Sequence, residues 1–457
     1  MNGVRANGSA GSAKGAAGSA TGAAAPARGY GPYAALSVVV ANMIGTGVFT
    51  SLGFQLLDLQ STFPLLLLWV VGGVAAFCGA ISYAELGAAI PRSGGEYTFL
   101  SRIYHPVAGF ISGWISATIG FAAPTALAAI TFGTYLASVF PTLSPTWLGA
   151  GLVVALTWIH ATTHRNSSFL QRSFTTVKVV LIAAFCVAAA TMVDTPQTVS
   201  LLPVRGDGAL VLSGAFAVSL IYVSYAYTGW NAATYLTGEV RRPGRTLPRV
   251  LGAGTLLVMV LYAALNYAFL RAAPMAELEG RLEVGYVAAT HVFGPVGAAI
   301  MGVTLATLLV STVSAMVMAG PRVLQVIGED YQAFRRLSRV NRHGIPAIAI
   351  VTQAALTLTF IVTASFESIL VFAGFTLGLN SLLAVAGVII LRVREPDAPR
   401  PYRTWGFPVT PLVYIGLTLW TLVYIAIDRP AEAAMAPLVI GAGLVFYLLA
   451  GRRARDA

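Results

Sequence analysis

The sequence predicts an all-α integral membrane protein that crosses the membrane twelve times. Of its 457 residues, 57% are apolar and only 10% carry a charge, whereas soluble domains carry a charge on about 25% of their residues. Apolar runs of about 20 residues, the length of a membrane-spanning helix, recur along nearly the whole chain. Basic residues collect in every second connection between these runs. These observations exclude a soluble globular protein and, for the bulk of the chain, a disordered one.

The expected spans lie between two polar ends. Residues 1–29 are rich in Gly, Ala and Ser, a composition typical of a flexible tail, and residues 451–457 form a short basic C-terminus. The tail has no apolar run like that of a signal peptide, so we expect the first span to act as the insertion signal. The twelve spans are expected at residues 33–55, 62–90, 107–138, 147–163, 173–193, 209–238, 248–272, 286–326, 345–364, 366–393, 408–427 and 433–450.

The positions of arginine and lysine predict the orientation. With the N-terminus in the cytoplasm, 23 of the 28 basic residues fall in cytoplasmic segments, as the positive-inside rule requires. We therefore expect a multi-pass protein of the cytoplasmic membrane with both termini in the cytoplasm. The net charge of +11 then reflects topology, and nucleic-acid binding is not expected, because no aromatic residues are interleaved with the arginines.

Few residues are suited to metal or covalent chemistry. The two cysteines, Cys78 and Cys186, both lie in apolar runs, which argues against a disulfide framework, and no His/Cys cluster suggests a metal. The chain contains no HExxH, GxSxG or Walker motif, and its only lysines are Lys14 and Lys178. We therefore predict no enzyme activity, no cofactor and no metal ion.

Two spans are expected to contain a helix interruption at comparable places. The first span includes Gly45, Thr46 and Gly47, and the sixth includes Gly229 between Thr228 and Trp230. Each segment alone is equally consistent with close helix packing. As a pair, interrupted helices that open two five-helix halves indicate the binding site of an inverted-repeat transporter. Freed N–H groups suit a carboxylate and freed carbonyls suit an ammonium group, so the pair favours a zwitterion such as an amino acid.

Four stretches of the sequence resemble the amino acid–polyamine–organocation transporter superfamily. They are residues 44–49 (IGTGVF), 83–97 (YAELGAAIPRSGGEY), 229–248 with the segments GWN, GEV and PGRTLP, and 394–403 with REP and RPYR. The resemblance implies a five-plus-five inverted repeat over residues 30–193 and 209–393, with two appended helices over residues 408–450. Within the superfamily, residues 229–231 look most like the L-type exchangers and their bacterial relatives.

The resemblance also implies the substrate-binding residues. Carboxylate donors fall on the amides of Gly45, Thr46 and Gly47, and a side chain at Gly47 is expected to obstruct the carboxylate. Tyr225 takes the place of an aromatic gate over the substrate. The amino-group acceptors and the remaining residues of the expected site are the following: carbonyls of Met43, Ile44, Tyr225, Ala226 and Thr228, together with Tyr227, Gly229 and Asn231. The connection at residues 141–146 has no cysteine, so no disulfide-linked heavy chain is expected.

Three charged residues are expected to act in gating or coupling. Glu85 and Glu239 lie near arginines at the inner ends of their helices, which favours interfacial ion pairs over direct substrate contact. Lys178 lies six residues beyond Arg172, about 9 Å into the membrane. Its side chain either snorkels to the interface or pairs with carbonyls freed in the first span. The resemblance suggests that its ammonium replaces the sodium ion of sodium-driven relatives.

These observations together predict a secondary active transporter for amino acids. No Asp or Glu lies in the interior of spans 1, 3, 6, 8 or 10, which favours small or medium neutral substrates. Sodium-independent exchange is the leading mechanism and proton symport the second, although span 3 lacks the carboxylate that some bacterial relatives use for proton coupling. The alternatives are a carrier of cationic amino acids or polyamines, a transport-dead amino-acid sensor, and a membrane enzyme.

Overall fold

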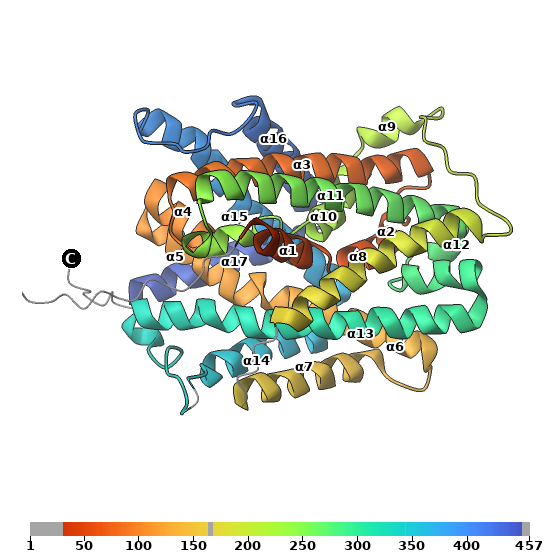
Figure 1. Cartoon of the computed structure of the whole chain (residues 1–457), viewed down its shortest axis with the longest axis horizontal. Helices are drawn as coiled ribbons and strands as arrows, with labels where there is room; N and C mark the ends of the chain where they lie inside the picture. The colour runs from red at the N-terminus through yellow and green to blue at the C-terminus, as the bar shows by residue number, and fades with distance from the viewer. Residues whose placement is uncertain (1–30, 163–167, 343, 450–457) are drawn as a thin grey trace, which may run out of the picture.

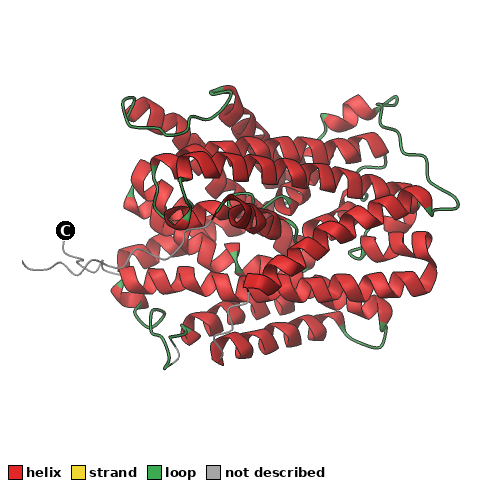
Figure 2. Ribbon diagram, in the orientation of Figure 1, coloured by secondary structure: helices red, strands yellow, loops and turns green. Residues whose placement is uncertain are grey.

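The computed structural model describes residues 31–162, 168–342 and 344–449. Within these ranges the chain forms helices and connecting loops and no β-strand (Figure 2). The expected tail at residues 1–29, the C-terminus at 451–457 and the last residue of the span expected at 147–163 lie outside the described residues.

The first half of the described chain contains five expected spans and a short helix between the second and third. The first and third spans are each built from more than one helical segment. The helices are α1 (Pro32–Met43), α2 (Gly47–Gln55), α3 (Thr62–Ala89), α4 (Glu96–Ile103), α5 (Pro106–Ile115), the π-helical segment η1 (Ser116–Gly120), α6 (Ala122–Val139), α7 (Pro145–Thr162) and α8 (Ser168–Thr191).

The second half begins with a short helix and an interrupted span, and it ends with two further long helices. Its elements are α9 (Asp207–Val211), α10 (Gly214–Ala226), the 3-10 helix η2 (Ala232–Glu239), α11 (Pro243–Ala272), α12 (Met275–Leu278), α13 (Val284–Asp330), the 3-10 helix η3 (Gln332–Phe334), α14 (Ala347–Thr363), α15 (Phe366–Arg394), α16 (Val409–Asp428) and α17 (Pro430–Leu449).

Nine segments of the described chain are long and apolar enough to cross a membrane. They coincide with nine of the twelve expected spans and support a multi-pass membrane protein. The span expected at 209–238 falls short because it divides into α10 and η2, and α14 has only 17 residues. The helix α7 has 18 residues and is also not among the nine.

The span expected at 286–326 is longer and is bent. Its helix, α13, covers 47 residues and contains a kink at Gly294, where φ is 70°. Pro295 follows directly and has no N–H to continue the helical hydrogen bonds. The expected single span therefore consists of a short helix before the kink and a long one after it, and the long one is the candidate to cross a membrane.

The long helices surround the two interrupted ones. In Figure 1, α3 and α11 run side by side along the long axis, α13 runs below them, and α1 and α10 lie between. The short helix α4 lies at one end of the bundle, whereas α9 and α12 lie at the other. The segment with α4 is predicted to be cytoplasmic, and the segments with α9 and α12 are predicted to be extracellular. These segments therefore occupy opposite ends of the molecule.

Candidate functional site

The first helix interruption exposes the start of α2. The helix α1 ends at Met43 and α2 begins at Gly47. The Gly45 N–H donates to the Met43 carbonyl at 2.8 Å, whereas no backbone acceptor within the described chain pairs with the N–H groups of Thr46 and Gly47. These N–H groups lie at the positive end of a nine-residue helix. The arrangement suits a bound anion.

The second interruption is a turn in which Thr228 bonds back to the end of α10. After α10 ends at Ala226, the Thr228 N–H and hydroxyl both donate to the Tyr225 carbonyl, at 2.9 and 2.7 Å. Gly229 has a φ of 100°, which a residue with a side chain rarely adopts. The chain then continues into η2. The segment is a tight turn between two halves of one span.

The two interruptions pack directly against each other. A Cβ atom added at Gly47 would lie 2.5 Å from the Ala226 Cα, and one added at Gly229 would lie 2.7 Å from the Asn42 carbonyl carbon. A side chain at Gly47 would therefore collide with the second interruption, and its obstruction of a carboxylate stays a prediction. A Cβ at Gly45 would meet no atom closer than the Met43 oxygen at 4.0 Å.

Most carbonyls of the expected amino-group site already accept a hydrogen bond. Tyr262, on α11, donates its hydroxyl to Met43 at 2.6 Å and to Ala226 at 3.3 Å, which ties both interruptions to a third helix. The Tyr225 carbonyl accepts from Thr228. Because a carbonyl has two lone pairs, the Met43 and Tyr225 carbonyls, which accept two bonds each, are filled, whereas the Ala226 carbonyl can accept one further bond.

Lys178 reaches the first interruption from α8. Its Nζ atom donates to the Ile44 carbonyl at 3.0 Å and to the Thr312 hydroxyl on α13 at 2.7 Å. The residue is only 6% exposed. The ammonium group therefore joins three helices inside the bundle, and the snorkelling alternative is wrong.

The expected aromatic and amide side chains of the second interruption point in different directions. Tyr225 is buried with its hydroxyl beside the side chain of Thr46. Tyr227 is fully buried and donates to the Trp69 carbonyl on α3 at 2.9 Å, away from the first interruption. The Asn231 amide donates to Glu96 at 2.6 Å. Tyr225 alone of these side chains faces the first interruption.

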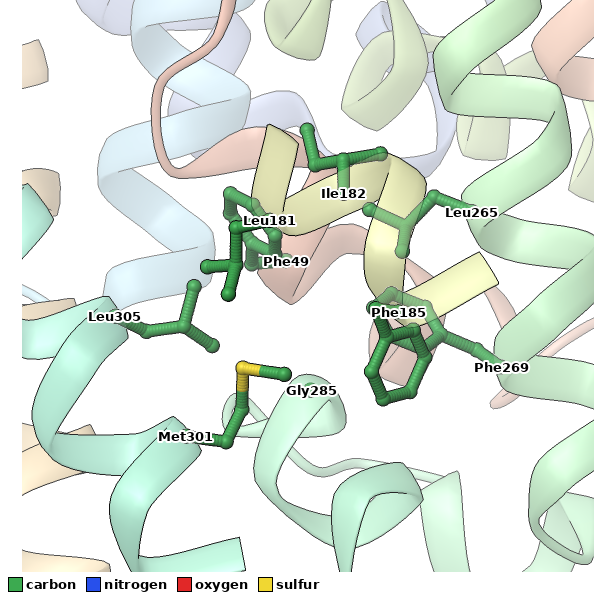
Figure 3. A pocket seen from close by; sticks show the side chains of 9 residues that line it. All are labelled: Phe49, Leu181, Ile182, Phe185, Leu265, Phe269, Gly285, Met301 and Leu305. Carbon is green, nitrogen blue, oxygen red and sulfur yellow. The ribbon is translucent and has the colours of Figure 1, made fainter. Parts of the chain in front are cut away.

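Two small cavities adjoin the first interruption. One is lined by Gly45, Phe49, Tyr135, Lys178 and leucines of α13. The second shares Phe49 and Leu305 with the first and is lined by apolar side chains of α2, α8, α11 and α13, which point toward one another in Figure 3. Each has a volume of about 10 Å³, close to the space of one water molecule. No carboxylate lines either cavity.

Glu85 is held in an ion-pair cluster near the C-terminal end of α3. Its carboxylate accepts two hydrogen bonds from Arg392, at 2.9 and 2.7 Å, and one from the Thr404 N–H at 2.6 Å. Arg400 lies 3.7 Å from the same carboxylate. The predicted pairing of Glu85 with arginine is confirmed. The cluster joins α3 to the C-terminal end of α15 and to the connection before α16.

Glu239 does not behave as the sequence suggested. It is exposed at the end of η2, and within the described chain no ion pair joins it to an arginine. A carboxylate in contact with water needs no charged partner, so its proximity to Arg241 and Arg242 in the sequence produces no contact.

Two buried residues near the interruptions were not singled out from the sequence. Tyr262 is described above. Glu96, the first residue of α4, is 2% exposed and accepts hydrogen bonds from Tyr83 at 2.9 Å and from Tyr235 at 2.5 Å, in addition to Asn231. Glu96 belongs to the stretch at residues 83–97, but that pattern did not indicate its burial.

Comparisons with known proteins agree with this geometry. The profile of a family described as amino acid permease matches residues 30–445. The chain belongs to the amino acid permease family. This family is part of the amino acid–polyamine–organocation superfamily, and the resemblance found in the sequence is confirmed.

Named relatives of this permease are amino acid transporters. The b(0,+)-type amino acid transporter 1 of Mus musculus is 26% identical over 92% of this chain and 87% of the relative. The large neutral amino acids transporter small subunit 2 is 28% identical over 92% of this chain, in both Rattus norvegicus and Homo sapiens, covering 80% and 79% of those proteins. These relatives support amino acid transport and a membrane location, and they are transporters and not enzymes by name.

Proposed function

We propose that this permease is a sodium-independent secondary transporter of neutral amino acids that works by alternating access in the cytoplasmic membrane, with both termini in the cytoplasm. Residues 30–193 and 209–393 form its two inverted halves, and residues 408–450 the appended helices. Exchange of one amino acid for another is the leading mechanism, and proton-coupled uptake is the second. We expect no disulfide-linked heavy chain, because residues 141–146 contain no cysteine.

The observation that carries this proposal is the contact of Lys178 with the first interruption. The Ile44 carbonyl, freed where α1 ends, receives the ammonium group at 3.0 Å. A sodium ion requires several such oxygen atoms as ligands, and here one of them and the Thr312 hydroxyl already serve a fixed cation. The positive charge that steadies the interruption is thus part of the chain and need not be supplied by an ion.

The substrate is recognised through its α-carboxyl and α-amino groups. The N–H groups of Thr46 and Gly47 lack backbone acceptors and suit the carboxylate. The Tyr225 carbonyl already accepts two bonds from Thr228, so the remaining acceptor capacity of the Ala226 and Thr228 carbonyls suits the ammonium group. Tyr225 closes over the substrate from the second interruption.

A neutral side chain is favoured by the surroundings. The cavity beside Gly45 contains Lys178 and otherwise apolar or tyrosine side chains, and the adjoining cavity is apolar. A cationic side chain placed there would face an ammonium group without a carboxylate partner. The relatives named as transporters of large neutral amino acids support the same class. We therefore expect alanine, serine and leucine to be carried in preference to arginine.

The test is uptake of radiolabelled amino acids into proteoliposomes that contain the purified full chain. The panel is leucine, alanine, serine, arginine and putrescine, each with and without internal leucine and with sodium or choline outside. We expect uptake of neutral amino acids that internal leucine stimulates and that choline leaves unchanged. Preferred uptake of arginine or putrescine, or dependence on sodium, would contradict the proposal. Binding without flux would instead favour an amino-acid sensor.

A further inference from the structure

A turn between α13 and α14 carries three arginines. It is formed by residues 334–339, which we call the arginine turn. Arg335, Arg336 and Arg339 are exposed, and among the described residues none of them forms an ion pair with a carboxylate. Their guanidinium groups are therefore free to bind an anion that does not belong to the chain.

The backbone of the arginine turn is fixed against the bundle. The Leu337 N–H donates to the Phe334 carbonyl at 2.8 Å. The Ser338 hydroxyl donates to the Arg335 carbonyl at 2.9 Å. A Cβ atom added at Gly328, on α13, would lie 2.7 Å from the Phe334 oxygen, so the turn lies directly against this helix. The arginines therefore extend from an ordered backbone, which lowers the entropy cost of arranging them around a ligand.

The arginine turn adjoins the end of a helix that faces lipid. The ring of Phe334 lies 5.6 Å, between centroids, from the ring of Phe446 in the last turn of α17. Of the candidate spans in the described chain, α17 is the least buried, and its last two residues, Leu448 and Leu449, are 71% and 75% exposed. An uncovered apolar helix surface contacts acyl chains in a bilayer. The boundary between acyl chains and headgroups therefore falls near the arginine turn.

The arginine turn lies at the end of the molecule that is predicted to be cytoplasmic. Tyr97, on α4, donates its hydroxyl to Asp330 at the end of α13, at 3.0 Å, and the connection after α13 lies at the same end as α4 (Figure 1). Basic residues just outside the hydrocarbon region attract anionic phospholipids. An arginine fork donates two parallel hydrogen bonds to a phosphate group. The chemistry of the turn therefore suits the phosphate of a lipid headgroup.

We propose that the arginine turn is a binding site for the phosphate of an anionic phospholipid, whose acyl chains lie along the exposed surface of α17. A zwitterionic lipid carries the same phosphate, but its cationic group would face the arginines as a like charge. A free phosphate has the negative charge but no chains to cover α17. The site therefore selects lipids whose headgroup has a net negative charge, such as phosphatidylglycerol.

The test is thermal unfolding of the purified full chain in detergent micelles, with added dioleoyl phosphatidylglycerol, dioleoyl phosphatidylcholine or glycerol phosphate. A ligand that binds the folded protein raises its melting temperature. We expect phosphatidylglycerol to raise it by at least about 3 °C, and the other two compounds to raise it by less than half as much. No rise with phosphatidylglycerol, or an equal rise with either of the other compounds, would overturn the proposal. No flux is measured, so the outcome does not depend on the transport function.

The arginines are tested by combining Arg335→Gln, Arg336→Gln and Arg339→Gln. These side chains are exposed, so the melting temperature without lipid should stay unchanged. The phosphatidylglycerol concentration that gives half of the rise should increase at least about tenfold, because three charges near the headgroups are lost. Arg336→Gln alone should increase it at least about threefold, and it decides the test if the triple variant does not fold. An unchanged concentration would overturn the proposal.

The matched control removes the same number of charges from the start of α11. Arg241, Arg245 and Arg249 are also exposed and form no ion pair among the described residues. They lie before and within the first turns of a long helix, and not on the turn packed against α13. The variant with all three changed to glutamine should respond to phosphatidylglycerol as the wild type does. A loss equal to that of the arginine-turn variant would show that total charge attracts the lipid, and it would overturn the proposal.

Discussion

The two interrupted helices meet at the centre of the molecule, but they differ in the side chains that bond to their backbones. The Ile44 carbonyl of the first accepts a hydrogen bond from the ammonium group of Lys178. The second turns on Gly229 and satisfies the Tyr225 carbonyl with Thr228. We propose that the first interruption holds charged groups and that the second acts as a hinge.

This difference suggests separate roles for the two interruptions in binding and in movement. We propose that ligand binding and the fixed cation belong to the first interruption, and that movement belongs to the second, where Asn231 bonds to Glu96. Substitutions at the first should alter affinity and flux together. Substitutions at the second should alter flux more than affinity.

The largest effect is expected from Lys178→Ala. It removes the hydrogen bonds to Ile44 and Thr312, each worth about 1.5–3 kcal/mol when the donor is charged. Leucine flux in proteoliposomes should fall at least about tenfold, with normal membrane insertion. Thr312→Val, which keeps the bond to Ile44, should retain more flux than Lys178→Ala. Near-normal flux in Lys178→Ala would contradict a role for the lysine at the first interruption.

A smaller effect is expected where the two interruptions touch. In Gly47→Ala the new Cβ lies 2.5 Å from the Ala226 Cα, and the backbone must shift. Overpacking of this kind costs about 1–3 kcal/mol, so the melting temperature in detergent and the affinity for leucine should both fall. Gly45→Ala is the control, because its Cβ has open space. Equal behaviour of the two variants would show that the interruptions do not form one packed unit.

The hinge can be tested with a pair of glycines of similar backbone conformation. Gly229 and Gly206 have φ values of 100° and 103°, but only Gly229 would place a Cβ against Asn42, at 2.7 Å. Both alanine variants lose about 1 kcal/mol from the left-handed backbone. The Gly229→Ala variant should also lose flux. If Gly206→Ala reduced leucine flux equally, the hinge assignment would fail.

The smallest effect is expected from Tyr262→Phe. The single hydrogen of the hydroxyl is shared between carbonyls of both interruptions, and a neutral hydrogen bond contributes about 0.5–1.5 kcal/mol. The ring remains packed against Trp69 at a centroid distance of 5.6 Å. Leucine affinity, measured by scintillation proximity, should therefore fall by less than tenfold. A loss as large as that of Lys178→Ala would place the main support of the site on α11 instead of α8.

Much of this arrangement follows from local sequence. Glycines inside apolar spans predicted both interruptions. A single lysine inside a span predicted carbonyl partners, because a charged group in lipid cannot stay unpaired. The positions of nine spans follow from length and hydropathy alone. These are features that a few neighbouring residues determine.

The remaining features depend on contacts between distant residues. Tyr262 lies 219 residues from Met43, and Glu96 lies 135 residues from Asn231. A tyrosine in an apolar run and a glutamate in a loop have many possible surroundings, so their patterns do not reveal such partners. The sequence likewise placed Glu239 beside arginines that it does not contact. Glu239 makes no such contact because it is exposed to solvent, and proximity in the sequence does not show whether a residue is exposed.

The central claim is that the interruptions recognise the α-carboxyl and α-amino groups of an amino acid. Its most direct test is competition for radiolabelled leucine binding to the purified protein by unlabelled leucine, leucine methyl ester and isoamylamine, the decarboxylated form. Unlabelled leucine should displace the label. The ester and the amine should compete at least about a hundredfold more weakly, because each loses the charged bonds to the N–H groups of Thr46 and Gly47. Competition by the ester or the amine equal to that of leucine would contradict the claim.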